Sequence, residues 1–181
     1  MILIDVKTDN ITDYKKTSLL IAFPYCSGKC PGCQNAHLQN YKTTITASAD
    51  DIADLYSNLN THEAIVMAGL EPFDSFDDVL DIIDSVGYLK KPCDFVIYTG
   101  YNLDEYQTQF ETELINRFKS IRHFDNKNLI VKIGRYDESQ TKPWYNKTLG
   151  VTLATKNQFT RAYLNTGRGF DEHYKEEKEE K

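Results

Sequence analysis

Three of the four cysteines in this 181-residue chain lie close together, at Cys26, Cys30 and Cys33, with the spacing C-x3-C-x2-C. Thiolates are soft ligands that suit iron–sulfur clusters, zinc and copper. A structural zinc site closes its shell with four protein ligands, commonly in two pairs. This chain has three clustered cysteines but no second pair of cysteine ligands. The loop therefore predicts a metal centre whose fourth ligand must be found elsewhere.

Two residues are candidates for that fourth ligand. Cys93 lies about sixty residues later, where it opens an expected strand, so we expect it at the amino end of the sheet as an ordinary buried cysteine. His37 follows Cys33 by four residues and is the better local candidate. The alternative is that the position is left open, which marks a reactive centre. Both interpretations stay open from the cysteines alone.

The elements around the loop alternate between short apolar runs and helical patterns. The alternation predicts a mainly parallel sheet with right-handed crossovers. Four units are too few for a closed eight-stranded barrel, so we expect an open sheet. The expected strands are 18–23, 63–69, 94–100 and 128–134, and the expected helices are 48–59, 74–89 and 102–121, with a further helix starting at Pro31.

Each unusual motif follows one of these strands. They are the cysteine loop, "AGLEPF", "YTGY" and "IGRYDESQ". Ligands of open parallel sheets bind beyond the carboxyl ends of the strands. We therefore expect the four motifs to form one site.

The cysteine loop after the first strand resembles the signature of the radical S-adenosylmethionine (SAM) superfamily. The resemblance implies a [4Fe-4S] cluster held by Cys26, Cys30 and Cys33, with one iron open for SAM. Reductive cleavage of SAM then yields methionine and a 5′-deoxyadenosyl radical, which abstracts a hydrogen atom. The implied fold is α/β, a partial, open radical-SAM-type βα barrel. In such enzymes the cofactor carries the chemistry, and the protein holds and orients it.

Within that superfamily, the chain looks most like the activating proteins of anaerobic ribonucleoside-triphosphate reductases. The matching stretches are "CPGC" at 30–33, "YTGY" at 98–101, "GRYDESQ" at 134–140 and "ATKNQ" at 154–158. The resemblance runs from about residue 15 to about residue 162. It implies a radical SAM oxidoreductase that generates a glycyl radical on a large reductase subunit, with a flavodoxin- or ferredoxin-like electron donor.

The resemblance also implies cofactor contacts. Gly69, Leu70, Glu71 and Pro72 match a "GGEP"-type turn that binds the amino group of SAM, although Leu70 replaces one glycine. Gly69 would admit the ligand, and Glu71 would accept from its ammonium.

Further contacts follow from the other motifs. Gly32, Cys33 and Gln34 would lie against the adenosyl part, and Gly32 stands where most members carry an aromatic residue. Thr99 would lie near SAM without a specific role. Lys132 or Arg135 could meet the carboxylate or ribose of SAM, or an acidic partner surface.

Three rival functions remain. They are an activase of another glycyl radical enzyme, such as a formate-lyase type, a small-molecule radical SAM enzyme of the carboxydeazaguanine synthase type, and a structural zinc module with His37 as the fourth ligand. The binding partner, SAM turnover and the bound metal distinguish them.

Composition limits the remaining possibilities. The chain is 40% hydrophobic and 27% charged, with a formal net charge of −6. We expect one domain over 1–170 and a disordered or frayed acidic tail over 171–181. The charge argues against a general nucleic-acid binder. No long apolar run or signal-like start is present, so we expect a cytoplasmic protein with reduced thiols and no membrane partner.

Overall fold

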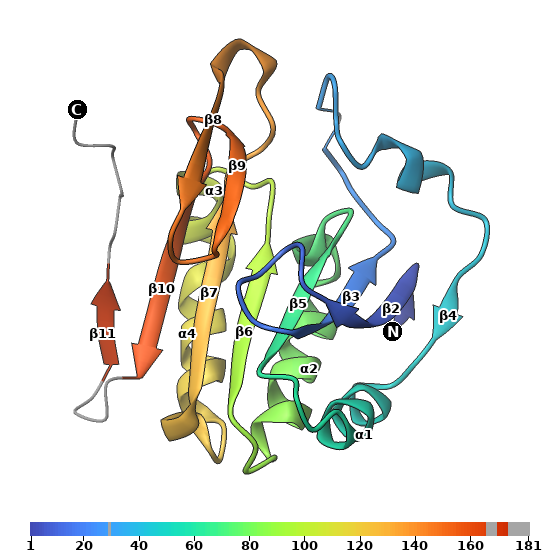
Figure 1. Ribbon diagram of the computed structural model, residues 1–181, viewed down its shortest axis with the longest axis vertical. Coiled ribbons are helices and arrows are strands. Elements are labelled where there is room, and N and C mark those ends of the chain that lie inside the picture. The colour runs from blue at the N-terminus through green and yellow to red at the C-terminus, as the bar shows by residue number, and fades with distance from the viewer. Residues whose placement is uncertain (29, 166–169, 174–181) are drawn as a thin grey trace.

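The computed structural model describes residues 1–28, 30–165 and 170–173, which form a mixed α/β structure (Figure 1). The strands are β1 (Ile2–Leu3), β2 (Asp5–Asn10), β3 (Ser18–Phe23), β4 (Ile45–Thr46), β5 (Ala64–Gly69), β6 (Cys93–Tyr98), β7 (Lys127–Ile133), β8 (Thr141–Asn146), β9 (Val151–Thr155), β10 (Phe159–Asn165) and β11 (Phe170–His173). The α-helices are α1 (Ala49–Asn58), α2 (Phe76–Gly87), α3 (Leu103–Tyr106) and α4 (Thr112–Ser120). Single turns are η1 (Ala36–Asn40), η2 (Pro72–Ser75), the π-turn η3 (Gln107–Glu111), η4 (Phe124–Asn126) and η5 (Glu138–Gln140).

Seven strands form the main sheet, in the order β11-β10-β7-β6-β5-β3-β2. The central strands β3, β5, β6 and β7 are parallel to their neighbours within this group, and β2 and β10 pair with it antiparallel. These four parallel strands are the four expected from the sequence, because continuous apolar runs suit strands that are covered on both faces. The described strands leave the sheet open, with β11 and β2 at its two edges.

Helices α1, α2 and α4 cover one face of the sheet (Figure 1). Their apolar side chains join those of the strands in the larger core cluster. In α2, the buried Val79, Ile82, Ile83 and Val86 recur at helical spacing, which is what directs one side of the helix to the sheet. Helix α1 begins at a capping box, in which the side chains of Ser48 and Asp51 each accept from the backbone N–H of the other.

The opposite face is covered by the β8–β9 hairpin and by the segment between β2 and β3 (Figure 1). Tyr14, Leu149 and Leu153 pack there with strand residues such as Val66 and Val96 in a second, smaller core cluster. This cover extends to the carboxyl ends of the parallel strands and therefore forms part of the walls around the site.

One expected helix is not formed. The sequence predicts a helix starting at Pro31, but the structure has a tight turn there, followed only by the short 3-10 helix η1. Gly32 has a positive φ of 67°, which interrupts any helix at its second residue. The helix expected over 102–121 is present, but the π-turn η3 divides it into α3 and α4.

The carboxyl-terminal prediction is only partly within the described residues. Of the acidic tail expected over 171–181, the first three residues belong to β11, which pairs with β10, and 174–181 lie outside the described residues. Among the described helices, none has both the length and the apolar character needed to cross a membrane.

A buried polar contact fastens the segment between β2 and β3 to the sheet, and this contact gives a stability prediction. The hydroxyl of Tyr14 donates to Asp94 at 2.7 Å, and the same carboxylate accepts from Lys16 and Asn128 at 2.8 and 2.6 Å. Because a buried hydrogen bond to a charged group contributes more than a neutral one, Tyr14→Phe should lower the free energy of unfolding by about 1–2 kcal/mol.

Chemical denaturation measures this change. Tyr145→Phe is the control, because Tyr145 is 60% exposed and its replacement should leave the midpoint unchanged. Equal unfolding midpoints for Tyr14→Phe and the original chain would show that this contact does not stabilise the packing of the segment between β2 and β3 on the sheet.

Candidate functional site

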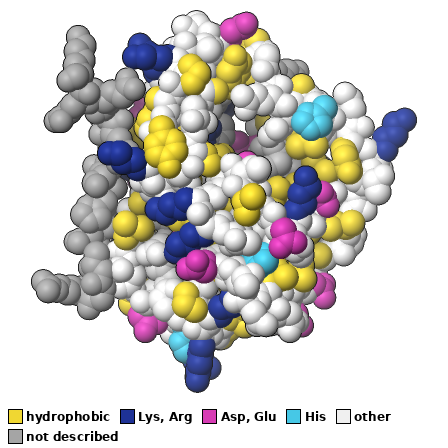
Figure 2. All heavy atoms as spheres, in the orientation of Figure 1, with side chains coloured by type: hydrophobic (Ala, Val, Ile, Leu, Met, Phe, Trp, Pro, Cys, Tyr) yellow, Lys and Arg dark blue, Asp and Glu magenta, His cyan; other side chains and the backbone are white. Residues whose placement is uncertain are grey.

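A cavity of about 320 Å³ lies at the carboxyl ends of the parallel strands. The loop after β3 contributes the three clustered cysteines, and the ends of β5, β6 and β7 contribute their following turns. Strand β9 supplies another wall with four consecutive residues, 151–154. The surface is visibly hollowed in this region, beside the β8–β9 hairpin (Figure 2). The four motifs that follow the parallel strands thus meet around one cavity.

The three clustered thiols are free and half-buried, and all three line this cavity. Burial raises the pKa of the Cys26 thiol, and the carboxylates of Glu71 and Asp74 add to that effect. The sulfur of Cys26 lies 3.6 Å from the carbonyl oxygen of Gly28 and donates to it. Among the described residues, no three His, Cys, Asp or Glu side chains converge closely enough to coordinate a metal ion in this arrangement. The thiols share a cavity without forming a compact ligand set.

The "CPGC" stretch forms a tight turn, and its residue types explain why. The backbone N–H of Cys33 donates to the carbonyl of Cys30 at 3.2 Å, which closes a four-residue turn. Pro31 and Gly32 occupy its two central positions, and the positive φ of Gly32 is typical of a type II turn. A Cβ on Gly32 would lie 3.1 Å from the ring of Tyr136. The backbone conformation of the turn therefore favours glycine, and a larger residue would also push against the Tyr136 ring.

Asp74 ties the cysteine loop to the rest of the site, and the sequence patterns did not single it out. Its carboxylate accepts from the backbone N–H of Ser27, from the Ser27 hydroxyl at 3.2 Å, and from the hydroxyl of Tyr101 at 2.7 Å. A second tie comes from Asn35, whose side-chain amide donates to the carbonyl of Gly69 at 2.6 Å. Side chains, more than regular secondary structure, hold this loop in place.

Glu71 is buried and joins two neighbouring turns. One carboxylate oxygen accepts from the N–H of Phe73 at 3.1 Å, and the other accepts from the N–H of Gly100 at 2.7 Å. Burial raises the pKa of this carboxyl group, while the hydrogen bonds from Gly100, Thr99 and Phe73 oppose the rise. Glu71 lines the cavity, but part of its accepting capacity already serves to connect the end of β6 to η2.

Gly69 lines the cavity and also packs closely against β3. The sequence suggests a glycine that admits a ligand, but its φ is 93° and a Cβ there would lie 2.7 Å from the backbone nitrogen of Phe23. In the structure, the backbone that comes close to Gly69 is therefore that of β3. Leu70, which stands where the family motif has a second glycine, lines the cavity, and its N–H donates to the carbonyl of Phe23 at 3.0 Å.

Lys132 and Arg135, the two cations at the end of β7, differ in their surroundings. Lys132 is only 7% exposed and lines the cavity, and its ammonium donates to the carbonyl of Gly134 at 2.5 Å. Arg135 also lines the cavity but is more exposed. It donates to the carbonyl of Gly100 at 3.0 Å and lies 3.4 Å from the carboxylate of Glu105.

The late "ATKNQ" stretch supports the turn after β7. The side-chain amide of Asn157 donates to the carbonyl of Arg135 at 2.8 Å. The Gln158 side chain accepts from the N–H groups of Ala154 and Thr155 at 3.1 and 3.2 Å. Through Asn157, the "ATKNQ" stretch is therefore tied to the "GRYDESQ" stretch, at Arg135.

The structure brings most of the predicted site residues to the cavity. Gln34 and the buried Thr99 line it, as do Cys33, Gly69 and Glu71. Gly32 is not among the lining residues, although it packs under Tyr136, which is. Of the two candidates for the fourth ligand, His37 is exposed and does not line the cavity. Cys93 is buried at the first residue of β6, at the opposite end of the sheet.

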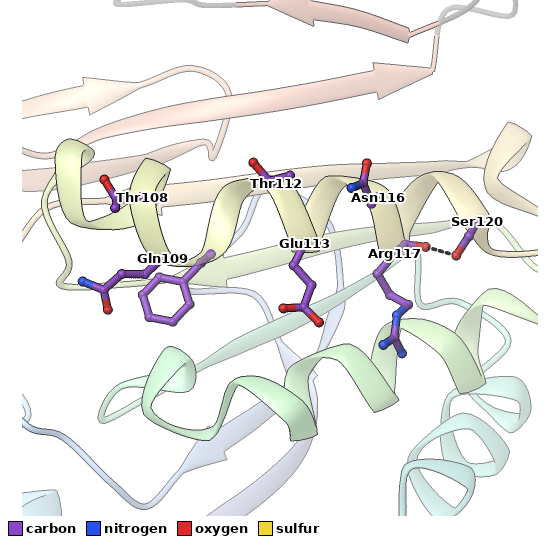
Figure 3. A pocket seen from close by; sticks show the side chains of 8 residues that line it. Thr108, Gln109, Thr112, Glu113, Asn116, Arg117 and Ser120 are labelled. Carbon is purple, nitrogen blue, oxygen red and sulfur yellow. Dashed lines mark hydrogen bonds between the residues drawn. The ribbon is translucent and has the colours of Figure 1, made fainter.

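Another hollow, of about 450 Å³, lies on the outer side of η3 and α4 (Figure 3). It contains none of the predicted site residues. Hydroxyl and amide side chains such as Thr108, Gln109 and Asn116 line it, together with Arg117, which forms an ion pair with Asp84. Nothing in this hollow resembles the thiol-lined cavity.

Comparison with known proteins agrees with the chemistry of the cysteine loop. The family model described as "4Fe-4S single cluster domain" matches residues 16–146, well over half of the chain. No curated protein and no solved structure matches the chain. The matched range begins just before β3 and includes all four parallel strands and the turns that follow them, but not the wall that β9 supplies. By this match, the chain belongs to the family of 4Fe-4S single cluster domains.

Proposed function

We propose that this protein is a radical SAM activase that uses a [4Fe-4S] cluster to generate a glycyl radical on an anaerobic ribonucleoside-triphosphate reductase. The observation that carries the proposal is the meeting of three free thiols with the turns after β5, β6 and β7 around one cavity. On this proposal, the open sheet is a partial radical-SAM-type βα barrel, and the protein works in the cytoplasm.

Cys26, Cys30 and Cys33 would hold the cluster. Gly28 supports this assignment, because a Cβ there would lie 3.4 Å from the sulfur of Cys26 and 3.8 Å from that of Cys30. The missing side chain leaves space between two of the thiols. When bound, the cluster and SAM supply one-electron cleavage of a carbon–sulfur bond and abstraction of a hydrogen atom.

The remaining cavity residues would position SAM. Gln34 lies on the cysteine loop, and the turn at Gly69 and Glu71 lies beside the end of β6, where Thr99 is. Glu71 retains acceptor capacity, since each carboxylate oxygen can accept more than the one backbone hydrogen bond described above. Its fixed carboxylate suits the ammonium of an amino acid such as the methionyl part of SAM.

The position of His37 argues for three ligands over four. A structural zinc site needs a closed set of protein ligands, but His37 is exposed and outside the cavity, and Cys93 lies at the opposite end of the sheet. The thiol-lined cavity also reaches a hollowed surface (Figure 2). We infer that a loop of a large glycyl radical subunit enters there, and that a flavodoxin- or ferredoxin-like protein supplies electrons.

The first prediction concerns the ligands. Cys26→Ala, Cys30→Ala and Cys33→Ala should each lose most of the iron after anaerobic reconstitution, together with the brown colour of an iron–sulfur cluster. Cys93→Ala and His37→Ala should keep both. A colourless, zinc-loaded original chain, or loss of the cluster in Cys93→Ala, would contradict the three-cysteine site.

The second prediction concerns the tie to the cysteine loop. Asp74→Asn should make the reconstituted protein lose iron to a chelator several-fold faster, because an amide cannot accept all the hydrogen bonds that the carboxylate of Asp74 accepts. Asp77→Asn is the matched control, since Asp77 is exposed in the first turn of α2. Identical rates for the two variants would show that the tie does not hold the loop around the cluster.

The third prediction tests the reaction itself. The reduced, reconstituted protein should cleave SAM to 5′-deoxyadenosine, and addition of an anaerobic reductase subunit should give the electron spin resonance signal of a glycyl radical. Cys30→Ala should give neither product. A radical on a formate-lyase-type enzyme alone would reassign the partner. Turnover of a small pterin-like substrate without a protein partner would favour the small-molecule class.

A further inference from the structure

We propose that Lys132 sets the reduction potential of the cluster, by placing a buried positive charge in the same cavity as Cys26, Cys30 and Cys33. This inference rests on the cluster ligation in the proposed function. It does not depend on SAM or on the identity of the protein partner.

The position of Lys132 is unusual for a lysine. Lysine side chains almost never become fully buried without a partner. Lys132 lies at the carboxyl end of β7, is 7% exposed, and donates to one carbonyl, that of Gly134. Among the described residues no further hydrogen-bond acceptor and no carboxylate pairs with this ammonium, which has three N–H donors.

Glu71 is a buried carboxylate in the same cavity and a candidate for a counter-charge, but its oxygens are held by other donors. Its two oxygens accept from Phe73 and Gly100, and no ion pair joins it to Lys132 among the described residues. Burial lowers the pKa of Lys132 to about 8, and the negative charges of Glu71 and Cys30 oppose that decrease. An anionic group in the cavity would stabilise the charged form further.

The cluster is the anion that this arrangement fits. Three thiolates make a [4Fe-4S] centre anionic, and reduction by one electron adds another negative charge without making or breaking a bond. A nearby buried cation stabilises the reduced form more than the oxidised form, because the Coulomb energy grows with the charge of the cluster. Net charge and burial are among the factors that set cluster potentials. Lys132 therefore raises the potential and makes the cluster easier to reduce.

The test compares reconstituted variants without SAM. Lys132→Met removes the charge and keeps an unbranched apolar side chain, whereas Lys132→Arg keeps the charge. Lys127→Met is the control, because Lys127 is buried at the opposite end of the same strand, where it donates to the carbonyls of Leu89 and Lys91. Midpoint potentials are measured by a redox titration followed by electron spin resonance, with the iron content of each sample.

The expected result is a more negative midpoint potential for Lys132→Met, and potentials close to that of the original chain for Lys132→Arg and Lys127→Met. Full iron content with an unchanged potential in Lys132→Met would overturn the inference, even if SAM binding became weaker. If Lys132→Met holds no iron, the Lys132→Arg variant decides. A cluster retained in Lys132→Arg supports a need for the positive charge, and a cluster lost in Lys132→Arg overturns the inference. An original chain without iron would instead contradict the proposed function.

Discussion

The buried carboxylate of Glu71 connects the ends of neighbouring strands, and the site depends on this connection. It accepts from the backbone on both sides, at Phe73 in the turn after β5 and at Gly100 in the turn after β6. A carboxylate that is removed from water needs such donors, since an unpaired buried charge is costly. The same constraint fixes the two turns relative to each other and thereby gives the cavity one of its rigid sides.

The cysteine loop contrasts with that rigid side. Over its described residues it has little secondary structure of its own beyond turns between 30 and 35 and the short η1. Asp74 and Asn35 tie it to the turns after β5 and β6, and the backbone N–H of Glu71 donates to the carbonyl of Tyr25 at 2.7 Å. A loop held by side chains can adjust its sulfurs around a bound group while its ends stay fixed. This is consistent with thiols that share a cavity without converging.

The sequence was informative where chemistry and hydrophobic pattern agreed. The four parallel strands could be predicted because each is a short apolar run that ends at a turn, and the motifs after them meet because parallel strands end at one edge. The helix expected from Pro31 was wrong, since proline favours both a first helical turn and a tight turn, and Gly32 decides between them. Asp74 could not be found, because its partners Ser27 and Tyr101 are distant in the chain. The role of Gly69 also depended on how closely β3 approaches it.

The arrangement of the two faces has a consequence for how such a protein can diverge. Helices α1, α2 and α4 stabilise the sheet from one side, while the site is built from turns and from the β8–β9 hairpin. Changes in the helices can alter thermal stability and surface properties with little effect on the cavity. Changes in the hairpin alter access to the cavity without disturbing the larger core. The two faces are therefore open to separate selection, and the hairpin can vary wherever its residues do not pack in the smaller core cluster with Leu149 and Leu153.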